Sequence, residues 1–163
     1  MRWLMVVAVG LGLLCASRVV SAQGAVKEEK VKRRMVPVHE IPASVKAAIR
    51  KEATKYFVTS VVLVTYGDKK RYEAEWTAKD KKIEIILDAE GKVTEREVVV
   101  PMGSVPWIAA DAITKAAGDN KFEVKKVAAG ERKLYEARWT VAGRRVEIRF
   151  DTDGRAVRKE VEE

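Results

Sequence analysis

The chain has 163 residues, 47% of them apolar and 34% charged, a composition typical of a folded globular protein and not of a disordered one. It carries 32 Lys and Arg against 24 Asp and Glu, a formal net charge of +8 at pH 7. Its single cysteine and single histidine exclude a disulfide framework, thiolate metal sites and most sites built on a catalytic histidine. We therefore expect no cofactor, no bound metal and no enzymatic activity.

Residues 1–22 have the features of a secretory signal peptide. They begin with Arg2, continue with an apolar run over residues 3–16, and end at Ala22 in a small-residue cleavage sequence. A transmembrane helix needs ~20 apolar residues, so a membrane anchor is the less favoured alternative. We expect cleavage after Ala22 and a mature protein that is periplasmic or secreted.

Residues 23–37 are expected to form a flexible basic tail. Removal of Arg2 and Arg18 with the signal peptide leaves 30 bases against 24 acids, a net charge of +6, and half of this charge lies in the tail. The rest of the chain is close to neutral, which argues against a nucleic-acid-binding protein. Any membrane contact is expected only through this tail. Its five bases are Lys27, Lys30, Lys32, Arg33 and Arg34.

The remaining sequence contains an internal repeat, with residues 38–100 matching residues 101–163. The offset is 64 residues through the first predicted helix and 63 from the Tyr–Trp strands onward, so one residue is lost in the loop between them. So many matches in register indicate a duplication. The matched segments are Ile41-Pro42 with Val105-Pro106, 72–77 with 135–140, and 88–92 with 151–155.

Each repeat begins with a predicted helix and continues with strands. Apolar residues recur at helical spacing over 45–53 and over 109–116, each time after a proline that suits a first helical turn. The following segments alternate apolar and polar residues, which predicts antiparallel strands covered on one face. Turns at Lys79-Asp80 and Ala142-Gly143 can close two-residue hairpins.

These patterns predict an α+β protein of two tandem repeats, each with one helix packed on a four-stranded antiparallel sheet. The helix would cover the apolar face of its sheet, and the polar face would lie open to solvent.

The order of motifs resembles the PepSY-like domains of bacterial secreted proteins. The resemblance rests on Pro42 with its spaced aliphatic residues, the strand at Tyr72, and the turn from Asp88 to Lys92. Such domains are similar in fold to the beta-lactamase inhibitory protein. The resemblance covers residues 38–163 and implies an extracytoplasmic binding or inhibitory module. The disulfides of that inhibitor are absent here, and none of its target-contacting positions can be matched.

The polar sheet faces are the expected partner-binding surface. The hairpin turns place Glu75 opposite Glu84 in the first repeat, whereas the second repeat holds Arg138 opposite Glu147. The first repeat would then carry an acidic patch; a functional carboxylate pair and neutralisation by Arg96 are alternatives. The candidate partner-binding residues are Glu73, Glu75, Glu84, Ile86, Trp107, Arg138 and Arg149.

Tryptophans occupy two kinds of position. Trp76 and Trp139 are equivalent in the two repeats and are expected in the core. Trp107 has Ala43 as its counterpart and either plugs the junction between the repeats or serves as an exposed binding anchor.

Together these observations predict a monomeric, non-enzymatic module that binds another extracytoplasmic protein, with inhibition of a hydrolase as one form of that binding. The alternative is an envelope-associated factor that binds an anionic polymer or lipid through the basic tail. A small enzyme or ion carrier that uses Glu75 and Glu84 is a third reading.

Overall fold

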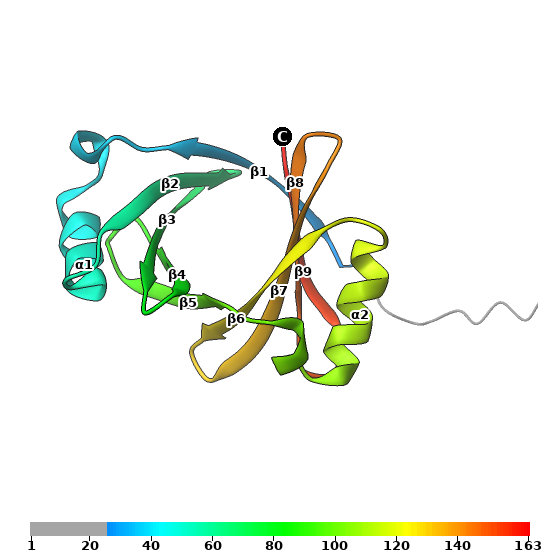
Figure 1. Cartoon of the computed structure of the whole chain (residues 1–163). Coiled ribbons are helices and arrows are strands. Elements are labelled where there is room, and N and C mark those ends of the chain that lie inside the picture. Colours follow the sequence, from blue (N-terminus) through cyan, green and yellow to red (C-terminus); the bar gives the residue numbers. More distant parts are fainter. Residues whose placement is uncertain (1–25) are drawn as a thin grey trace, which may run out of the picture.

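The computed structural model describes residues 26–163, and the predicted signal peptide lies outside the described residues (Figure 1). This part of the chain contains nine strands, two α-helices and two short 3-10 turns. No helix within it is long and apolar enough to cross a membrane. In chain order the elements are β1 (Glu28–Met35), η1 (Val38–Glu40), α1 (Ala43–Ala53), β2 (Val58–Tyr66), β3 (Lys69–Ala78), β4 (Lys81–Leu87), β5 (Val93–Val99), η2 (Met102–Ser104), α2 (Trp107–Ala117), β6 (Phe122–Ala129), β7 (Arg132–Val141), β8 (Arg144–Phe150) and β9 (Ala156–Glu162).

The strands form one closed barrel, so the prediction of two separate helix-on-sheet repeats is wrong. A helix followed by four strands does occur in each half of the chain, but β5 pairs antiparallel with β6 and joins the two sheets. Strand β1 closes the other seam, because it pairs antiparallel with β2 and parallel with β9. Two open four-stranded sheets would leave four edges of unpaired backbone groups, and closure pairs these edges.

Strand β1 is made of residues that were expected to form a flexible tail. Its first half pairs with β9, with Glu28 beside Lys159, and its second half pairs with β2, with Met35 beside Val62. Strand β5 alone fills the corresponding place at the other seam, where it pairs with both β4 and β6. The segment is therefore ordered because the barrel needs a strand between β9 and β2.

The two helices cover opposite outer sides of the barrel (Figure 1). Ile49 of α1 belongs to one apolar core with Trp76, and Ile113 of α2 belongs to a second core with Trp139. The expected core positions of both tryptophans are confirmed, since Trp76 is 3% exposed and Trp139 is 6% exposed. The apolar cores thus lie between the helices and the outer face of the sheet.

The extra residue of the first half lies in a strand and not in a loop. Strand β2 has a bulge between Val58 and Ser60, whereas β6 pairs with β7 without interruption from Phe122 to Ala129. A bulge places one additional residue in a strand and bends it. The two halves therefore differ in shape next to the start of β2.

The glycine turn between β4 and β5 packs against α1. Gly91 has φ +85°, and the carboxylate of Asp88 accepts hydrogen bonds from the backbone N–H groups of Glu90 and Lys92 at 3.1 and 2.8 Å. A Cβ atom on Gly91 would lie 2.7 Å from the carbonyl carbon of Ser44 in α1. Only glycine combines this φ with such a close approach to the helix backbone.

Replacing Gly91 with alanine should therefore destabilise the protein more than replacing Gly67, which also has positive φ but has open space around it. Both substitutions carry backbone strain of about 1–2 kcal/mol. We expect G91A to lose roughly 1–3 kcal/mol more because the methyl group must displace α1. Urea unfolding followed by tryptophan fluorescence measures the difference; equal losses in the two variants would show that the turn does not contact the helix so closely.

Candidate functional site

The polar faces of the sheet meet inside the barrel. Arg71 of β3 forms an ion pair with Glu160 of β9 at 2.7 Å, although these strands are not neighbours. Arg149 of β8 likewise reaches Glu97 of β5 at 2.6 Å. Such pairs span the lumen. The charged interior, as we call it, comprises Arg33, Arg71, Lys125, Arg138 and Arg149 with Glu73, Glu84, Glu97, Glu136, Glu147 and Glu160.

The predicted cross-strand registers are confirmed, but these residues face inward. Glu75 lies opposite Glu84, and Arg138 lies opposite Glu147. Strict alternation of polar and apolar residues is the same whether the polar face meets water or the lumen of a barrel. The sequence pattern alone did not distinguish these two cases.

Six of the seven candidate partner-binding residues belong to this inward-facing set or its rim. Glu73, Glu84, Ile86 and Arg149 are each no more than 6% exposed, so a protein docked on the closed barrel does not reach them. Glu75 and Arg138 are partly exposed, and both are engaged in ion pairs, with Lys82 at 3.3 Å and Glu147 at 2.6 Å respectively. The solvent-exposed polar sheet face that the prediction required is replaced by the charged interior.

Lys125 of β6 is one of several interior residues that sequence reasoning missed. It is 1% exposed, contacts Glu84 through a charge-assisted hydrogen bond, and lies 2.9 Å from Glu97. Arg96, the neutralising neighbour considered from sequence, instead pairs with Glu52 of α1 on the outside of the barrel. Lys125 could have been found from its position in the strand pattern, since it lies opposite Glu136 in the neighbouring strand and therefore shares its inward face.

Burial makes each interior charge dependent on its partners. Burial alone would raise the pKa of Glu147, but the charges of Arg138 and Arg33 hold that pKa well below its usual range. In Glu97 burial prevails and raises the pKa to about 8, with the nearby charge of Glu136 as the second cause. Within residues 26–163 no group of three or more His, Cys, Asp or Glu is arranged to hold a metal ion.

Removing Arg33 should strongly destabilise the barrel. Its guanidinium contacts Glu73 and lies 2.5 Å from Glu147, and R33A leaves both carboxylates buried without this partner. We expect a loss of about 3–5 kcal/mol in unfolding free energy. The neighbouring R34A is the control, because the Arg34–Glu40 pair is exposed and should be worth no more than about 1 kcal/mol. Equal, small losses in denaturant titrations would contradict a buried position of Arg33.

The raised pKa of Glu97 predicts how stability changes with pH. The folded protein keeps a proton up to about pH 8 that the unfolded chain releases near pH 4.5, so stability falls as the pH rises through this window and the contribution is lost above it. The slope is at most about 1.4 kcal/mol per pH unit. Urea midpoints of the wild type should fall between pH 5 and 8, and those of E97Q should stay flatter. Parallel curves for the two proteins would refute this assignment.

Most bases of the N-terminal segment already have acidic partners. Lys30 and Lys32 lie 3.7 and 3.9 Å from Glu163, Arg34 lies 2.8 Å from Glu40, and Arg33 is buried in the charged interior. Arg33 is thus held inside the barrel, whereas Lys30 and Lys32 are largely exposed and share the single carboxylate of Glu163.

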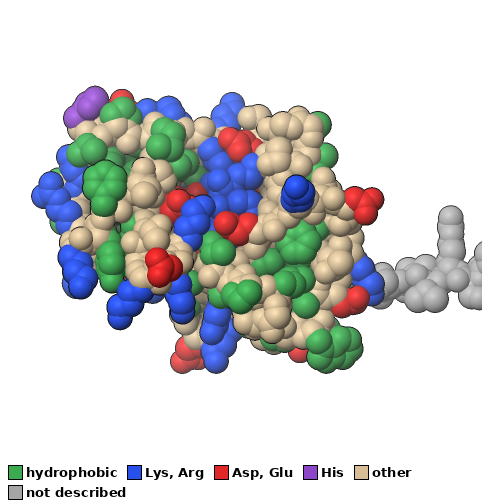
Figure 2. Space-filling view, in the orientation of Figure 1, with side chains coloured by type: hydrophobic (Ala, Val, Ile, Leu, Met, Phe, Trp, Pro, Cys, Tyr) green, Lys and Arg blue, Asp and Glu red, His purple; other side chains and the backbone are tan. Residues whose placement is uncertain are grey.

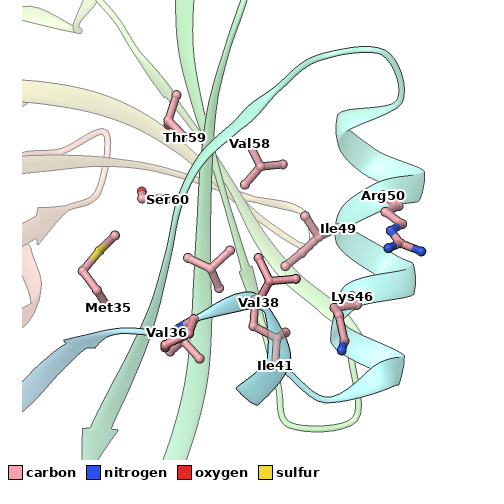
Figure 3. Close-up of a pocket in the computed structure, with 12 residues that line it drawn as sticks. Met35, Val36, Val38, Ile41, Lys46, Ile49, Arg50, Val58, Thr59 and Ser60 are labelled. Carbon is pink, nitrogen blue, oxygen red and sulfur yellow. The ribbon is translucent and has the colours of Figure 1, made fainter.

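An apolar groove opens on the outside of the barrel, between α1, the segment 36–41 and the start of β2. It has a volume of about 330 Å³. Figure 3 shows Ile49 from α1 and Val58 from β2 pointing into the same space. The α1 groove, as we call it, is lined by Met35, Val36, Pro37, Val38, Ile41, Lys46, Ile49, Arg50, Val58, Thr59, Ser60 and Val61.

Large apolar side chains are exposed around this groove. Met35 is 61% exposed, Val38 is 70% exposed, and Phe57, next to the lining residue Val58, is 84% exposed. Isolated exposed apolar residues are ordinary on a protein surface, whereas several beside one apolar cavity are a common feature of binding surfaces.

The helix side of the groove is basic. Lys46 and Arg50 lie one turn apart on α1, and neither has an acidic partner within 4 Å among the described residues. The acids closest in sequence are already paired, Glu40 with Arg34 and Glu52 with Arg96. At the α1 end of the molecule, Figure 2 shows Lys and Arg side chains around hydrophobic ones.

The second half of the chain has different residues at the equivalent places. Val58 and Phe122 occupy corresponding positions, because they lie beside Trp76 and Trp139 respectively. The larger Phe122 packs against the second apolar core. At the offset of 64 residues, Ala110 replaces Lys46 and Thr114 replaces Arg50. These differences could have been read from the repeat, but the functional meaning required the groove.

Trp107, the remaining candidate residue, is 78% exposed and is the first residue of α2. It therefore does not plug a junction between the halves. It lies on the opposite side of the barrel from α1, and its role as a partner contact stays a prediction (Figure 1).

Comparisons with known proteins establish the fold and no family. The sequence matches no protein-family model, and it matches no curated protein. A Bacteroides eggerthii protein provisionally described as periplasmic is similar in structure, with a TM-score of 0.51, 14% identity, and coverage of 74% of this chain and 88% of that one. A DUF2874 family protein from Bacteroides uniformis is also similar in structure, with a TM-score of 0.50, 17% identity, and coverage of 74% of this chain and 88% of that one. A BLIP-like protein from Bacteroides fragilis is more weakly similar, with a TM-score of 0.45, 14% identity, and coverage of 77% of this chain and 87% of that one.

Proposed function

We propose that this protein is a non-enzymatic protein-binding module of the periplasm or extracellular space, and that it binds its partner through the α1 groove. The observation that supports this is the apolar groove, with exposed Met35 and Val38 in its lining and exposed Phe57 next to the lining residue Val58 in the chain. Binding energy in protein interfaces is concentrated where a large side chain fills an apolar pocket that its neighbours shield from water. The groove offers such a pocket, and the exposed residues offer the shield.

The extracytoplasmic location is supported by the sequence of residues 1–22 and by the fold shared with the Bacteroides eggerthii protein. Fold similarity alone is a weak argument for function, and the site carries the proposal. Inhibition of an extracytoplasmic hydrolase remains the form of binding that the PepSY-like resemblance implies.

The charged interior also supports an external site. Its carboxylates and cations pair with one another across the lumen, which leaves the outer surface to meet other molecules. The partner contact thus moves from the polar sheet face to the helix-covered outside of the barrel.

Photo-crosslinking in the producing cells tests this proposal. A benzoyl-phenylalanine placed at position 57 should form a covalent adduct with a discrete protein, and V58F in the same chain should abolish it by filling the groove. The control position is 141, since Val141 is also an exposed apolar residue, at the end of β7, away from the groove lining. Identical adducts from both positions, no adduct from position 57, or adducts that V58F leaves unchanged would contradict a partner site at α1.

A further inference from the structure

We infer that the partner segment seated in the α1 groove is acidic as well as apolar. It inserts one or two large apolar side chains between α1 and β2 and places carboxylates against Lys46 and Arg50. This inference rests on the proposed function and adds the chemistry of the partner.

The apolar part follows from the lining and the size of the groove. Ile41, Ile49, Val58 and Val61 provide hydrocarbon walls, and polar side chains among the lining residues are confined to Lys46, Arg50, Thr59 and Ser60. The Thr59 hydroxyl is already used, because it donates to the carbonyl oxygen of Glu75 at 2.9 Å. A volume of about 330 Å³ lies at the lower end of ligand pockets, which span about 300–1,000 Å³, and suits side chains of a peptide.

The acidic part follows from uncompensated charge. Lys46 and Arg50 are four residues apart on α1 and so share one side of the helix. In Figure 3 the guanidinium of Arg50 points away from the apolar lining, so the charge lies beside the groove and not inside it. Lys51 in the last turn of α1 and Lys55 just after the helix add further positive charge near Arg50 in the chain. Carboxylates next to the inserted side chain would meet this charge, which speeds the encounter and sets its orientation.

The second half of the chain provides an internal contrast. The bulge, the small Val58 and the two cations occur together in the first half, and the unbroken β6, Phe122, Ala110 and Thr114 replace them in the second. The second half thus has a larger side chain at the position of Val58 and two uncharged residues at the positions of Lys46 and Arg50. Substituting the second-half residues into the first half should remove each feature while keeping a side chain that this architecture accepts.

Selection from a random 12-residue peptide library on phage tests the inference. The wild type is the target, and V58F is the counter-target. Enriched peptides should carry a net negative charge and at least one large apolar residue. The V58F substitution should lower the affinity of the protein for the best synthetic peptide by tenfold or more. The double variant K46A/R50T should lower this affinity by roughly 2–10-fold, as expected for the loss of two exposed ion pairs. Added salt should lower the affinity of the wild type by a similar factor, because it screens the same charges.

Two further variants separate specific effects from general ones. R132T/K133A removes the same charge from an exposed stretch at the start of β7 outside the groove lining and should leave peptide affinity unchanged. F57S should lower the affinity for the peptide. Because Phe57 is 84% exposed, this loss cannot arise from a damaged core.

The outcomes distinguish this inference from the proposed function. Neutral or basic peptides that still discriminate against V58F, or peptides indifferent to K46A/R50T, would overturn the acidic partner and leave the groove as the binding site. A selection that returns no peptide with a preference for wild type over V58F and F57S would overturn both.

Discussion

Ion pairs across the lumen of the barrel are the constraint on which the rest of this structure depends. Buried charges are expensive unless they are paired, and here each cation meets carboxylates from strands far apart in sequence. The arrangement is satisfied only when β5 joins β6 and β1 joins β9 and β2. Arg33 shows the dependence most clearly, since it comes from β1 and reaches Glu147 of β8. Polar groups that would make an open sheet soluble instead specify its closure.

Closure also decides where the molecule can meet others. With the polar face turned inward, the outside of the barrel consists of strands, two helices and the loops that join them. The two helices differ in their surroundings. Helix α1 borders an apolar groove and carries Lys46 and Arg50, which have no acidic partner among the described residues, whereas the larger Phe122 packs against the second core at the position that corresponds to Val58. The two halves also differ in local structure, because β2 has a one-residue bulge that β6 lacks. Each half of the described chain has a helix followed by four strands, and the two halves differ in the residues around α1 and the start of β2.

Much of the local structure could be predicted from the sequence. Helices at both repeats, the hairpin registers that pair Glu75 with Glu84 and Arg138 with Glu147, and the buried positions of Trp76 and Trp139 follow from periodicity and turn chemistry. The closure of the barrel could not be predicted, because the alternation of polar and apolar residues is the same whether the polar face meets water or other charges. Arg33 was hidden in a run of basic residues, and Lys125 among ordinary strand residues. The α1 groove depends on which side chains converge in space, which single-residue patterns do not report.

Hydrogen–deuterium exchange of strand β1 tests the closed barrel most directly, with β5 as the internal reference because it fills the corresponding place at the other seam. The account predicts that backbone amides of Glu28–Met35 exchange slowly, with protection approaching that of Val93–Val99. Exchange of the β1 amides at the rate of an unstructured peptide, with β5 still protected, would show that the barrel is open and that Arg33 does not belong to its interior.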